Sequence, residues 1–416
     1  MIVNLKNPLI IKLETGIVVF YLLFLENVIS IVPDIFMSRF AYLITLYFVF
    51  SRIKKIFYIL SKNLFLVFLI ALSAASFLWS VEPDQSLRTG IGIVRISLFG
   101  AYLAVRYSSQ DLLKLIASVL GIASVLSFST ALAVPGEGIM DGAWIGIYDH
   151  KNVLGRRMAL SAVLFIFWAL GSRNWRTQWS LWGLSGLSGF LVLMSQSFAS
   201  FILLGSFIPL LPFYKAIKNK SKITLKAAIF SILLFMSLLL SSVILNNLAL
   251  IFDFFGKDLS LTGRTPIWKG MLEISLDRPL LGYGIGNAMW KVPALVARTN
   301  QAWNAPDSHN GFLELLVGLG MIGLALFILS YLTTLVRTIS YVQIKQTGSI
   351  EDFWLIQYLV ILVLMNFSED ELLKAHTVWM LYVMVAVSTT MLILRSRNNT
   401  NPYLNYFHKN KFSSSL

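Results

Sequence analysis

The chain is dominated by long apolar stretches that match the thickness of a lipid bilayer. A transmembrane helix needs about 20 mostly apolar residues, and about 17 to 25 are tolerated. Hydrophobic residues make up 57% of the 416 residues and charged residues only 13%. Composition and stretch length together predict an all-α integral membrane protein. About twelve transmembrane helices are expected, near residues 16–32, 35–50, 64–79, 89–105, 112–134, 153–171, 179–194, 198–213, 225–245, 311–335, 353–367 and 377–394.

Lysine and arginine predict the orientation of these helices, because short loops rich in these residues stay on the cytoplasmic side. Most of the 34 basic residues fall on one side when both termini are cytoplasmic. The polar stretch 246–310, between the ninth and tenth helices, then becomes a large periplasmic loop. Residues 1–397 are expected to form one multi-pass domain, and the polar tail 398–416 to be cytoplasmic and disordered. The first apolar run has no small-residue cleavage site, which predicts a retained helix.

Charge and cysteine content exclude several classes of function. The net charge of +14 is largely explained by the orientation of the loops, so it does not indicate a nucleic-acid partner. The absence of cysteine excludes disulfides, thiolate metal sites and a cysteine nucleophile.

Two predicted periplasmic segments are basic, against the charge rule. The first, residues 144–157, contains His150, Lys151, Arg156 and Arg157 next to glycines. Cationic side chains beside glycines, which let a backbone approach a ligand, indicate an anion site. A loop that anchors the chain to lipid headgroups is the alternative. The two arginines lie inside the apolar run, where they either snorkel towards water or line a cavity.

The second basic segment is the large periplasmic loop. Its Arg264 carries a planar guanidinium that matches phosphate oxygens, although a lone arginine outside the membrane is more often structural. Residues 268–276 predict a short amphipathic helix at the membrane interface, with Trp268, Met271, Leu272 and Ser275 at helical spacing. The glycines in residues 278–287 lack the strand and βαβ context of a dinucleotide site, so they predict a tight turn.

His309 stands where a polar segment gives way to a long apolar run, at the periplasmic mouth of the tenth helix. An imidazole there can reach both water and a reacting group. A capping or interfacial histidine is the alternative, and Asp307 and Ser308 are themselves candidates for the helix cap. A catalytic role is favoured because both basic segments lie on the same side of the membrane and the sequence offers no other obvious catalytic set.

Two further charged residues need partners. Arg95 lies within the fourth span, where an arginine costs roughly 2.5 to 3.5 kcal/mol on insertion scales. It follows Arg88 by about two turns on nearly the same helical face. Arg95 is expected either to pair with a carboxylate such as Glu26 or to extend a cationic path into a cavity. Glu314, five residues after His309, is expected either to pair with an arginine or to orient the imidazole.

At these motifs the chain resembles the O-antigen ligase and polysaccharide polymerase superfamily of bacterial inner-membrane proteins. His309-Asn310, nine residues, and then Gly320-x-x-Gly323 resemble the signature of that family. The resemblance covers about residues 75 to 395.

The chain is most similar in its motifs to the ExoQ-like branch of exopolysaccharide production proteins. Residues 144–160, 261–290 and 78–83 each resemble a motif of that branch. One position departs from the pattern, because many relatives carry a basic residue where this chain has Phe198. A cationic contact is then either missing or supplied by an arginine of the first basic segment.

The resemblance implies a metal-independent glycosyltransferase of the GT-C-like architecture, without a cofactor, in the bacterial inner membrane. Its substrates would be undecaprenyl-diphosphate-linked glycans, as donor and as acceptor, with a flippase and a chain-length regulator as protein partners. By matching motif, Arg264 would bind the donor diphosphate and His309 would act at the acceptor hydroxyl. Further expected binding residues for diphosphate or glycan are Lys151, Arg156, Arg157, Asn310, Arg95, Arg88 and Glu314.

The expected reaction is polymerisation of lipid-linked repeat units into a surface polysaccharide or exopolysaccharide, by direct displacement with inversion at the anomeric carbon. Arginines would neutralise the developing phosphate charge, and a neutral histidine would accept the hydroxyl proton. The serious alternative is an O-antigen ligase that moves the glycan to lipid A core or to a protein. A transporter for lipid-linked glycans is less favoured, because it predicts charged residues and broken helices near mid-membrane.

Overall fold

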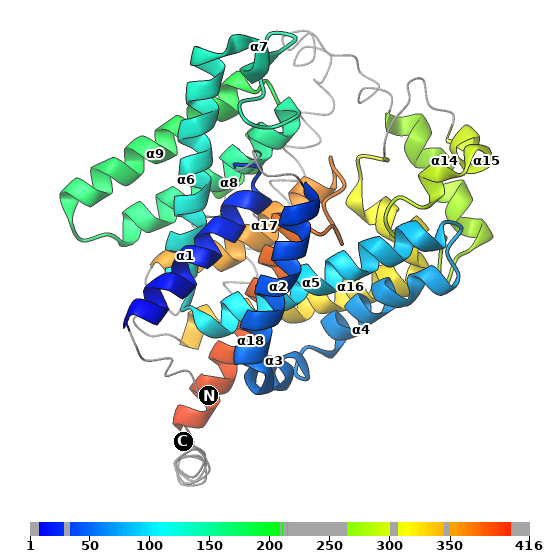
Figure 1. Cartoon of the computed structure of the whole chain (residues 1–416), viewed down its shortest axis with the longest axis horizontal. Coiled ribbons are helices and arrows are strands. Elements are labelled where there is room, and N and C mark those ends of the chain that lie inside the picture. The colour runs from blue at the N-terminus through cyan, green and yellow to red at the C-terminus, as the bar shows by residue number, and fades with distance from the viewer. Residues whose placement is uncertain are drawn as a thin grey trace.

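Helices make up most of the described chain, which comprises residues 8–28, 34–208, 210, 214, 264–299, 307–344 and 350–400 of the computed structural model (Figure 1). Within it, the strands form one short antiparallel pair. The elements are α1 (Pro8–Leu25), α2 (Asp34–Ser51), α3 (Ile53–Leu60), α4 (Leu64–Ala75), η1 (Ser76–Leu78), α5 (Pro83–Arg106), α6 (Ser109–Ala133), α7 (Pro135–Gly138), β1 (Ile139–Met140), β2 (Ala143–Trp144), α8 (Lys151–Gly171), α9 (Trp175–Met194), α10 (Phe198–Gly205), α14 (Arg264–Asp277), η2 (Met289–Lys291), α15 (Pro293–Arg298), α16 (Gly311–Ile344), η3 (Ile350–Phe353), α17 (Trp354–Asn366) and α18 (Thr377–Thr400).

The helices occur where the apolar stretches predict them. Every predicted span except the ninth coincides with at least part of a described helix, and the ninth, 225–245, lies outside the described residues. Five described helices are long and apolar enough to cross a membrane, and a sixth span results if α3 and α4, bent by 102°, count as one. The protein is therefore an all-α, multi-pass membrane protein, and the count of about twelve spans stays a prediction.

Helices α5 and α18 pack closely in the middle of the bundle. An added Cβ at Gly100 would lie only 2.7 Å from the carbonyl oxygen of Met380. In the same interface, Trp379 Nε1 donates a hydrogen bond to Ser97 Oγ at 2.8 Å. This packing fixes the start of α18, and with it the position of the preceding loop, residues 367–376.

The two ends of the bundle are held together by different charged groups. At the end predicted to be cytoplasmic, Glu14 pairs with Arg52 at 3.1 Å and with Arg106 at 2.9 Å. Arg337 donates a hydrogen bond to Asn63 Oδ1 at 2.7 Å at that same end. The loops predicted to be periplasmic meet at the opposite end, which we call the site end. The grouping of the loops agrees with the charge rule, while their sidedness in a membrane stays a prediction.

Helix α16 is broken at Gly320, which has φ 66° and ψ −168°. The first two N–H groups after the break donate to the carbonyls of Pro279 and Leu280. Two carbonyls before the break accept from the N–H groups of Tyr283 and Gly284. Backbone groups that a helix end leaves without partners are thereby satisfied by one loop. The tenth predicted span therefore consists of two helical segments, and the first of them belongs to the site end.

Helices α14 and α15 lie together at the site end, to the right in Figure 1, and α14 confirms the short helix predicted at residues 268–276. Met271 is fully buried, whereas Leu272 is 51% exposed and Leu276 is 75% exposed. Helix α14 therefore buries one side, which packs against α16, and keeps a second apolar side exposed. Contact of that exposed side with the membrane interface stays a prediction.

The predicted domain boundary lies inside a helix. Helix α18 continues to Thr400, beyond the boundary expected after Arg397. The rest of the tail, residues 401–416, and part of the predicted periplasmic loop, residues 246–263 and 300–306, lie outside the described residues.

Candidate functional site

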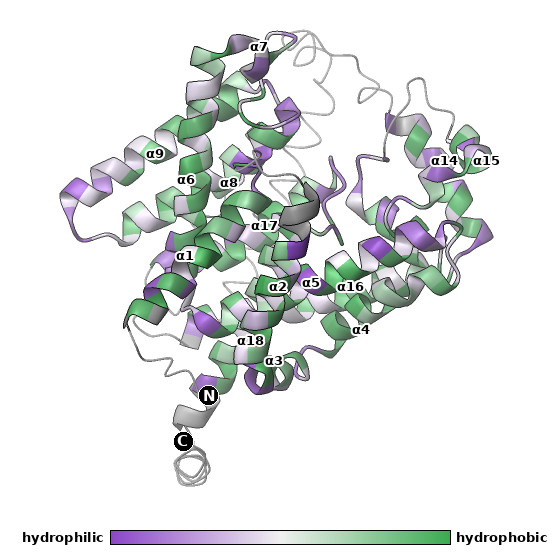
Figure 2. Ribbon diagram, in the orientation of Figure 1, coloured by the Kyte–Doolittle hydropathy of each residue, from purple (hydrophilic) through white to green (hydrophobic). Residues whose placement is uncertain are grey.

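The loop between α17 and α18 is the point where the candidate residues meet. Figure 2 shows hydrophilic ribbon gathering in the loops between α8, α17 and α14. The Glu369 carboxylate of this loop contacts four side chains, namely Arg156 at 2.8 Å, Asn152 at 2.9 Å, His309 Nδ1 at 3.2 Å and Arg264 at 3.6 Å. These five residues, called the site cluster below, join α8, α14, the start of α16 and the loop.

Helix N-termini surround the site cluster. Helix α8 begins at Lys151, and Asn152 in its first turn reaches the cluster carboxylate. Helix α16 begins at Gly311, whose N–H donates to the carbonyl of Glu369 at 3.1 Å. Arg264 is the first described residue of α14, and its Nη1 donates to the carbonyl of Ser368 at 2.5 Å. Because helix N-termini carry partial positive charge and free N–H groups, this arrangement favours an anion.

Arg156 and Arg157 are buried between helices, with exposed fractions of 6% and 8%. Arg156 forms a second ion pair with Glu371 at 2.9 Å, and Arg157 pairs with Glu26 at 3.3 Å. Tyr148 also approaches Glu26, with its hydroxyl 3.5 Å from the carboxylate. The interpretation that these arginines snorkel towards headgroups is therefore wrong, because both guanidinium groups point at buried carboxylates.

Glu369 and Glu371 of the loop are ionised at neutral pH. Burial would raise the pKa of Glu369, but Arg156 and His309 outweigh it and hold that pKa at about 2. The pKa of Glu371 is also about 2, because His376 and Arg156 outweigh the effect of burial. Burial lowers the pKa of His376 itself to about 4, so its imidazole is neutral at pH 7. The arginines thus remain the main positive partners of both carboxylates.

The backbone presents His309 in a left-handed conformation, with φ 50°. A residue with a side chain adopts this conformation at an energetic cost. Asp307 Oδ1 accepts a hydrogen bond from the His309 N–H at 2.9 Å, which stabilises the turn. Since the Glu369 carboxylate can only accept, Nδ1 carries the proton and the neutral ring has its lone pair on Nε2. This is the tautomer that a general base requires.

Asn310 caps α16, because its Oδ1 accepts from the N–H groups two and three residues further on at 3.1 and 3.2 Å. The cap is therefore Asn310 and not Asp307 or Ser308, whose polar atoms are used inside the turn. Glu314 supports the same turn by accepting from the Ser308 N–H at 2.7 Å, and it also accepts from Trp290 Nε1 at 2.8 Å. The observed role of Glu314 differs from both expected roles, pairing with an arginine and orienting the imidazole, since its carboxylate holds the backbone of the turn.

Lys374 links the loop to the turn that carries His309. Its Nζ lies 2.8 Å from Asp370 and 3.6 Å from Asp307. Burial, reinforced by Glu314, raises the pKa of Asp370 to about 8 in spite of this contact. Burial would lower the pKa of Lys374, but Asp370 and Asp307 raise it, so the ammonium is charged.

Arg88 and Arg95 lie on α5, and their contacts differ from the expected ones. The guanidinium carbon of Arg95 lies 4.5 Å from the centre of the Tyr42 ring. The expected pairing of Arg95 with Glu26 is wrong, because Glu26 pairs with Arg157. Arg88 is exposed. A cationic path along α5 stays a prediction.

The sequence motifs predicted the basic residues of the site but not the carboxylates that pair with them. Asn152, Glu369, Glu371 and Lys374 were not among the candidates. The sequence did contain a signal for Glu369 and Glu371. Residues 369–371 form one of two short acidic loops predicted to lie on the same side of the membrane as both basic segments.

Comparison with known proteins adds two findings. The model of the O-antigen ligase family matches residues 183–328, a stretch that contains Arg264 and His309. The exopolysaccharide production protein ExoQ of Rhizobium meliloti (strain 1021) is 26% identical to this chain over 288 residues. The aligned part covers 64% of this chain, and the chain spans about 62% of the length of that relative. Both findings confirm the resemblance on which the site was predicted.

Proposed function

We propose that this protein polymerises undecaprenyl-diphosphate-linked oligosaccharide repeat units into a surface polysaccharide or exopolysaccharide, on the outer face of the bacterial inner membrane. One observation carries the proposal. His309 and Arg264, the two residues of the family motifs with an expected role in catalysis, contact the same carboxylate of Glu369 at the site end of the bundle. The similarity to O-antigen ligases and to an exopolysaccharide production protein supports the same class of reaction.

In the proposed reaction, a hydroxyl oxygen of the acceptor glycan attacks the anomeric carbon of the donor. The bond from that carbon to the diphosphate oxygen breaks, undecaprenyl diphosphate leaves, and the configuration inverts. The hydroxyl proton passes to Nε2 of His309. The Glu369 carboxylate, 3.2 Å from Nδ1, stabilises the imidazolium that forms. General-base catalysis of this kind typically contributes about 100- to 10,000-fold in rate.

Arg264 is the guanidinium best placed to receive the donor diphosphate. Arg156 is held by two short ion pairs with carboxylates, whereas Arg264 lies 3.6 Å from Glu369 and its side chain is 17% exposed. A planar guanidinium matches two phosphate oxygens. Lys151 at the start of α8 would add a second cation. The flippase and chain-length regulator proposed as partners would deliver the donor and end chain growth.

Ligation is the second candidate function. The matching family model is described as O-antigen ligase, which favours transfer of the glycan to lipid A core or to a protein. The chemistry at the anomeric carbon is the same in both reactions, so only the acceptor differs.

Reconstitution tests the proposal. Purified protein in liposomes is supplied with lipid-linked repeat units and no other acceptor, and chain length is followed by gel electrophoresis. A polymerase extends the units, whereas a ligase leaves them unextended. His309→Ala should slow synthesis about 100- to 10,000-fold and Arg264→Ala about 100- to 1000-fold. The exposed Arg173→Ala serves as the control, and full synthesis by His309→Ala at normal protein level would contradict the role of His309.

A further inference from the structure

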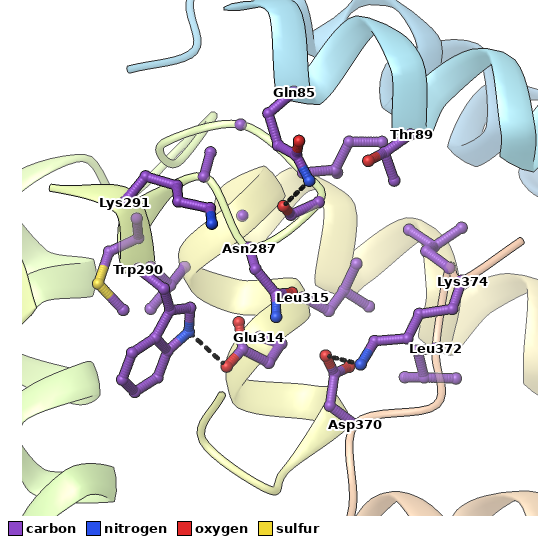
Figure 3. Close-up of a pocket in the computed structure, with 18 of the residues that line it drawn as sticks. Gln85, Thr89, Asn287, Trp290, Lys291, Glu314, Leu315, Asp370, Leu372 and Lys374 are labelled. Atoms are coloured by element: carbon purple, nitrogen blue, oxygen red, sulfur yellow. Dashed lines mark hydrogen bonds and ion pairs between the residues drawn. The ribbon is translucent and has the colours of Figure 1, made fainter. Parts of the chain in front are cut away.

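A pocket of about 580 Å³ lies next to the site cluster and is lined by other residues. In Figure 3, Asn287 and Lys291 come from the loop after α14, and Gln85 comes from α5. The ion pair of Asp370 and Lys374 lies across the pocket from Lys291. The volume falls within the range of about 300 to 1000 Å³ that is usual for small-molecule sites.

The loop that lines this pocket is built to a fixed shape. Gly284 has φ 98° and Gly286 has φ 77°. An added Cβ at Gly284 would lie 2.1 Å from Ser80 Oγ, and one at Gly286 would lie 2.2 Å from Thr89 Oγ1. The two glycines therefore let the loop backbone press against Ser80 and Thr89, and this close contact fixes the shape of the pocket wall.

The lining suits a neutral, hydroxyl-rich ligand better than a phosphate. The Lys374 ammonium is held 2.8 Å from a carboxyl oxygen of Asp370, and Glu314 adds a second carboxyl group to the wall. Carboxyl groups offer a diphosphate no counter-charge, whereas their oxygens accept hydrogen bonds from hydroxyl groups. The amide of Asn287 and the ammonium of Lys291 supply donors, and leucines in the wall match the C–H faces of a sugar ring.

The wall of the pocket also holds the turn that carries His309. Glu314 accepts a hydrogen bond from the N–H of Ser308, and Lys374 lies 3.6 Å from Asp307. Two direct contacts thus join the pocket wall to the turn that carries the imidazole.

We infer that this pocket binds the sugar rings of the acceptor glycan and so places the acceptor beside His309. The inference rests on the proposed function, since it names the site of one of the two substrates. The diphosphate-linked donor then occupies the opposite side, at Arg264. Neighbouring residues of one loop serve the two sides, with Glu369 facing the arginines and Asp370 facing the pocket.

Binding of a free oligosaccharide tests the inference without catalysis. The probe is the repeat-unit oligosaccharide released by mild acid from the lipid-linked pool of the same cells, titrated against the full chain in detergent and followed by saturation-transfer NMR. Asn287→Gly keeps the left-handed backbone that Asn287 adopts, with φ 58°, and removes the amide. Lys291→Ala removes the ammonium, and Lys269→Ala, an exposed lysine of α14, is the matched control.

The two pocket variants should each weaken binding of the oligosaccharide about 2- to 10-fold, the usual effect of losing one hydrogen bond. In the reconstituted assay they should raise KM for the acceptor and leave KM for the donor unchanged. Arg264→Ala should bind the oligosaccharide as the wild type does. Unchanged binding in Asn287→Gly and Lys291→Ala overturns the inference even if synthesis proceeds. Binding that depends on Asn287 in a protein that extends no chains supports the pocket and refutes polymerisation.

Discussion

The imidazole of His309 lies 3.2 Å from the carboxylate of Glu369, although 60 residues separate them in the chain. The contact connects the turn before α16 with the loop before α18. It fixes the ring in the tautomer that has its lone pair on Nε2. Glu369 is therefore a positioning residue for His309, and this role can be tested apart from folding.

Glu369→Gln should lower kcat at least about tenfold and change the pH profile of the reaction. An amide in place of the carboxylate no longer stabilises the imidazolium, and it can present either an oxygen or an NH₂ group to the ring, so the tautomer is no longer fixed. The measurement is chain extension by reconstituted protein as a function of pH. Glu369→Asp should recover part of the rate, and Glu137→Gln, at an exposed site, should behave as wild type. Equal rates for Glu369→Gln and wild type across the pH range would exclude this role.

Arg156→Met should destabilise the protein strongly. The substitution leaves Glu369 and Glu371 buried without their shared counter-charge, and removing one partner of a buried pair typically costs about 3 to 5 kcal/mol. Thermal unfolding in detergent measures the effect. The exposed Arg173→Met is the matched control and should leave Tm almost unchanged. Adding Glu371→Gln to Arg156→Met should restore part of the loss, and a double variant less stable than the single one would argue against charge as the cause.

The basic half of the site could be predicted from the sequence because its residues are conspicuous there. Arg156 inside an apolar run, and Arg264 in a loop predicted to be periplasmic, both violate the usual distribution of charge. Glu369 does not, because an acidic residue in a short polar loop is typical of a solvated surface. Its importance depends on burial, and burial follows from how α17 packs against α8 and α18.

The helices could also be predicted, because the length of an apolar span is a local property of the sequence. The break at Gly320 could not, because the apolar pattern continues through it and the partners of the broken backbone lie at Pro279 and Leu280. The pairing of Arg157 with Glu26 likewise required knowledge that the end of α1 lies against α8. The sequence therefore does not show which segments, distant from one another in the chain, come into contact in the fold.

His376 should make the protein less stable at mildly acidic pH. Its pKa is lowered on folding from 6.5 to about 4, so the unfolded chain binds the proton more readily. The stability is fully present above about pH 6.5 and is lost as the pH falls towards 4. Between pH 7.5 and pH 5, wild type should lose roughly 2 to 4 °C more in Tm than His376→Gln. An equal loss in the two proteins would contradict a His376 that is neutral at pH 7. Asp370 contributes in the opposite direction, and the comparison removes its effect because both proteins contain it.

Gly320→Ala should disrupt the site end more than any other single methyl group added to α16. The backbone at Gly320, with φ 66° and ψ −168°, lies in a region that is essentially restricted to glycine. An added Cβ would also lie 2.2 Å from the carbonyl carbon of Leu280, whose oxygen accepts from the N–H of Ile322. Both effects act on the loop that caps the two halves of α16. We expect a large fall in Tm, or loss of folded protein, together with loss of chain extension. Gly183→Ala is the control, because an added Cβ in α9 at that position meets nothing within 4 Å and alanine favours a helix. If Gly320→Ala matched Gly183→Ala in Tm and in activity, the break in α16 would not be needed to hold the His309 turn, and a continuous helix would serve equally well.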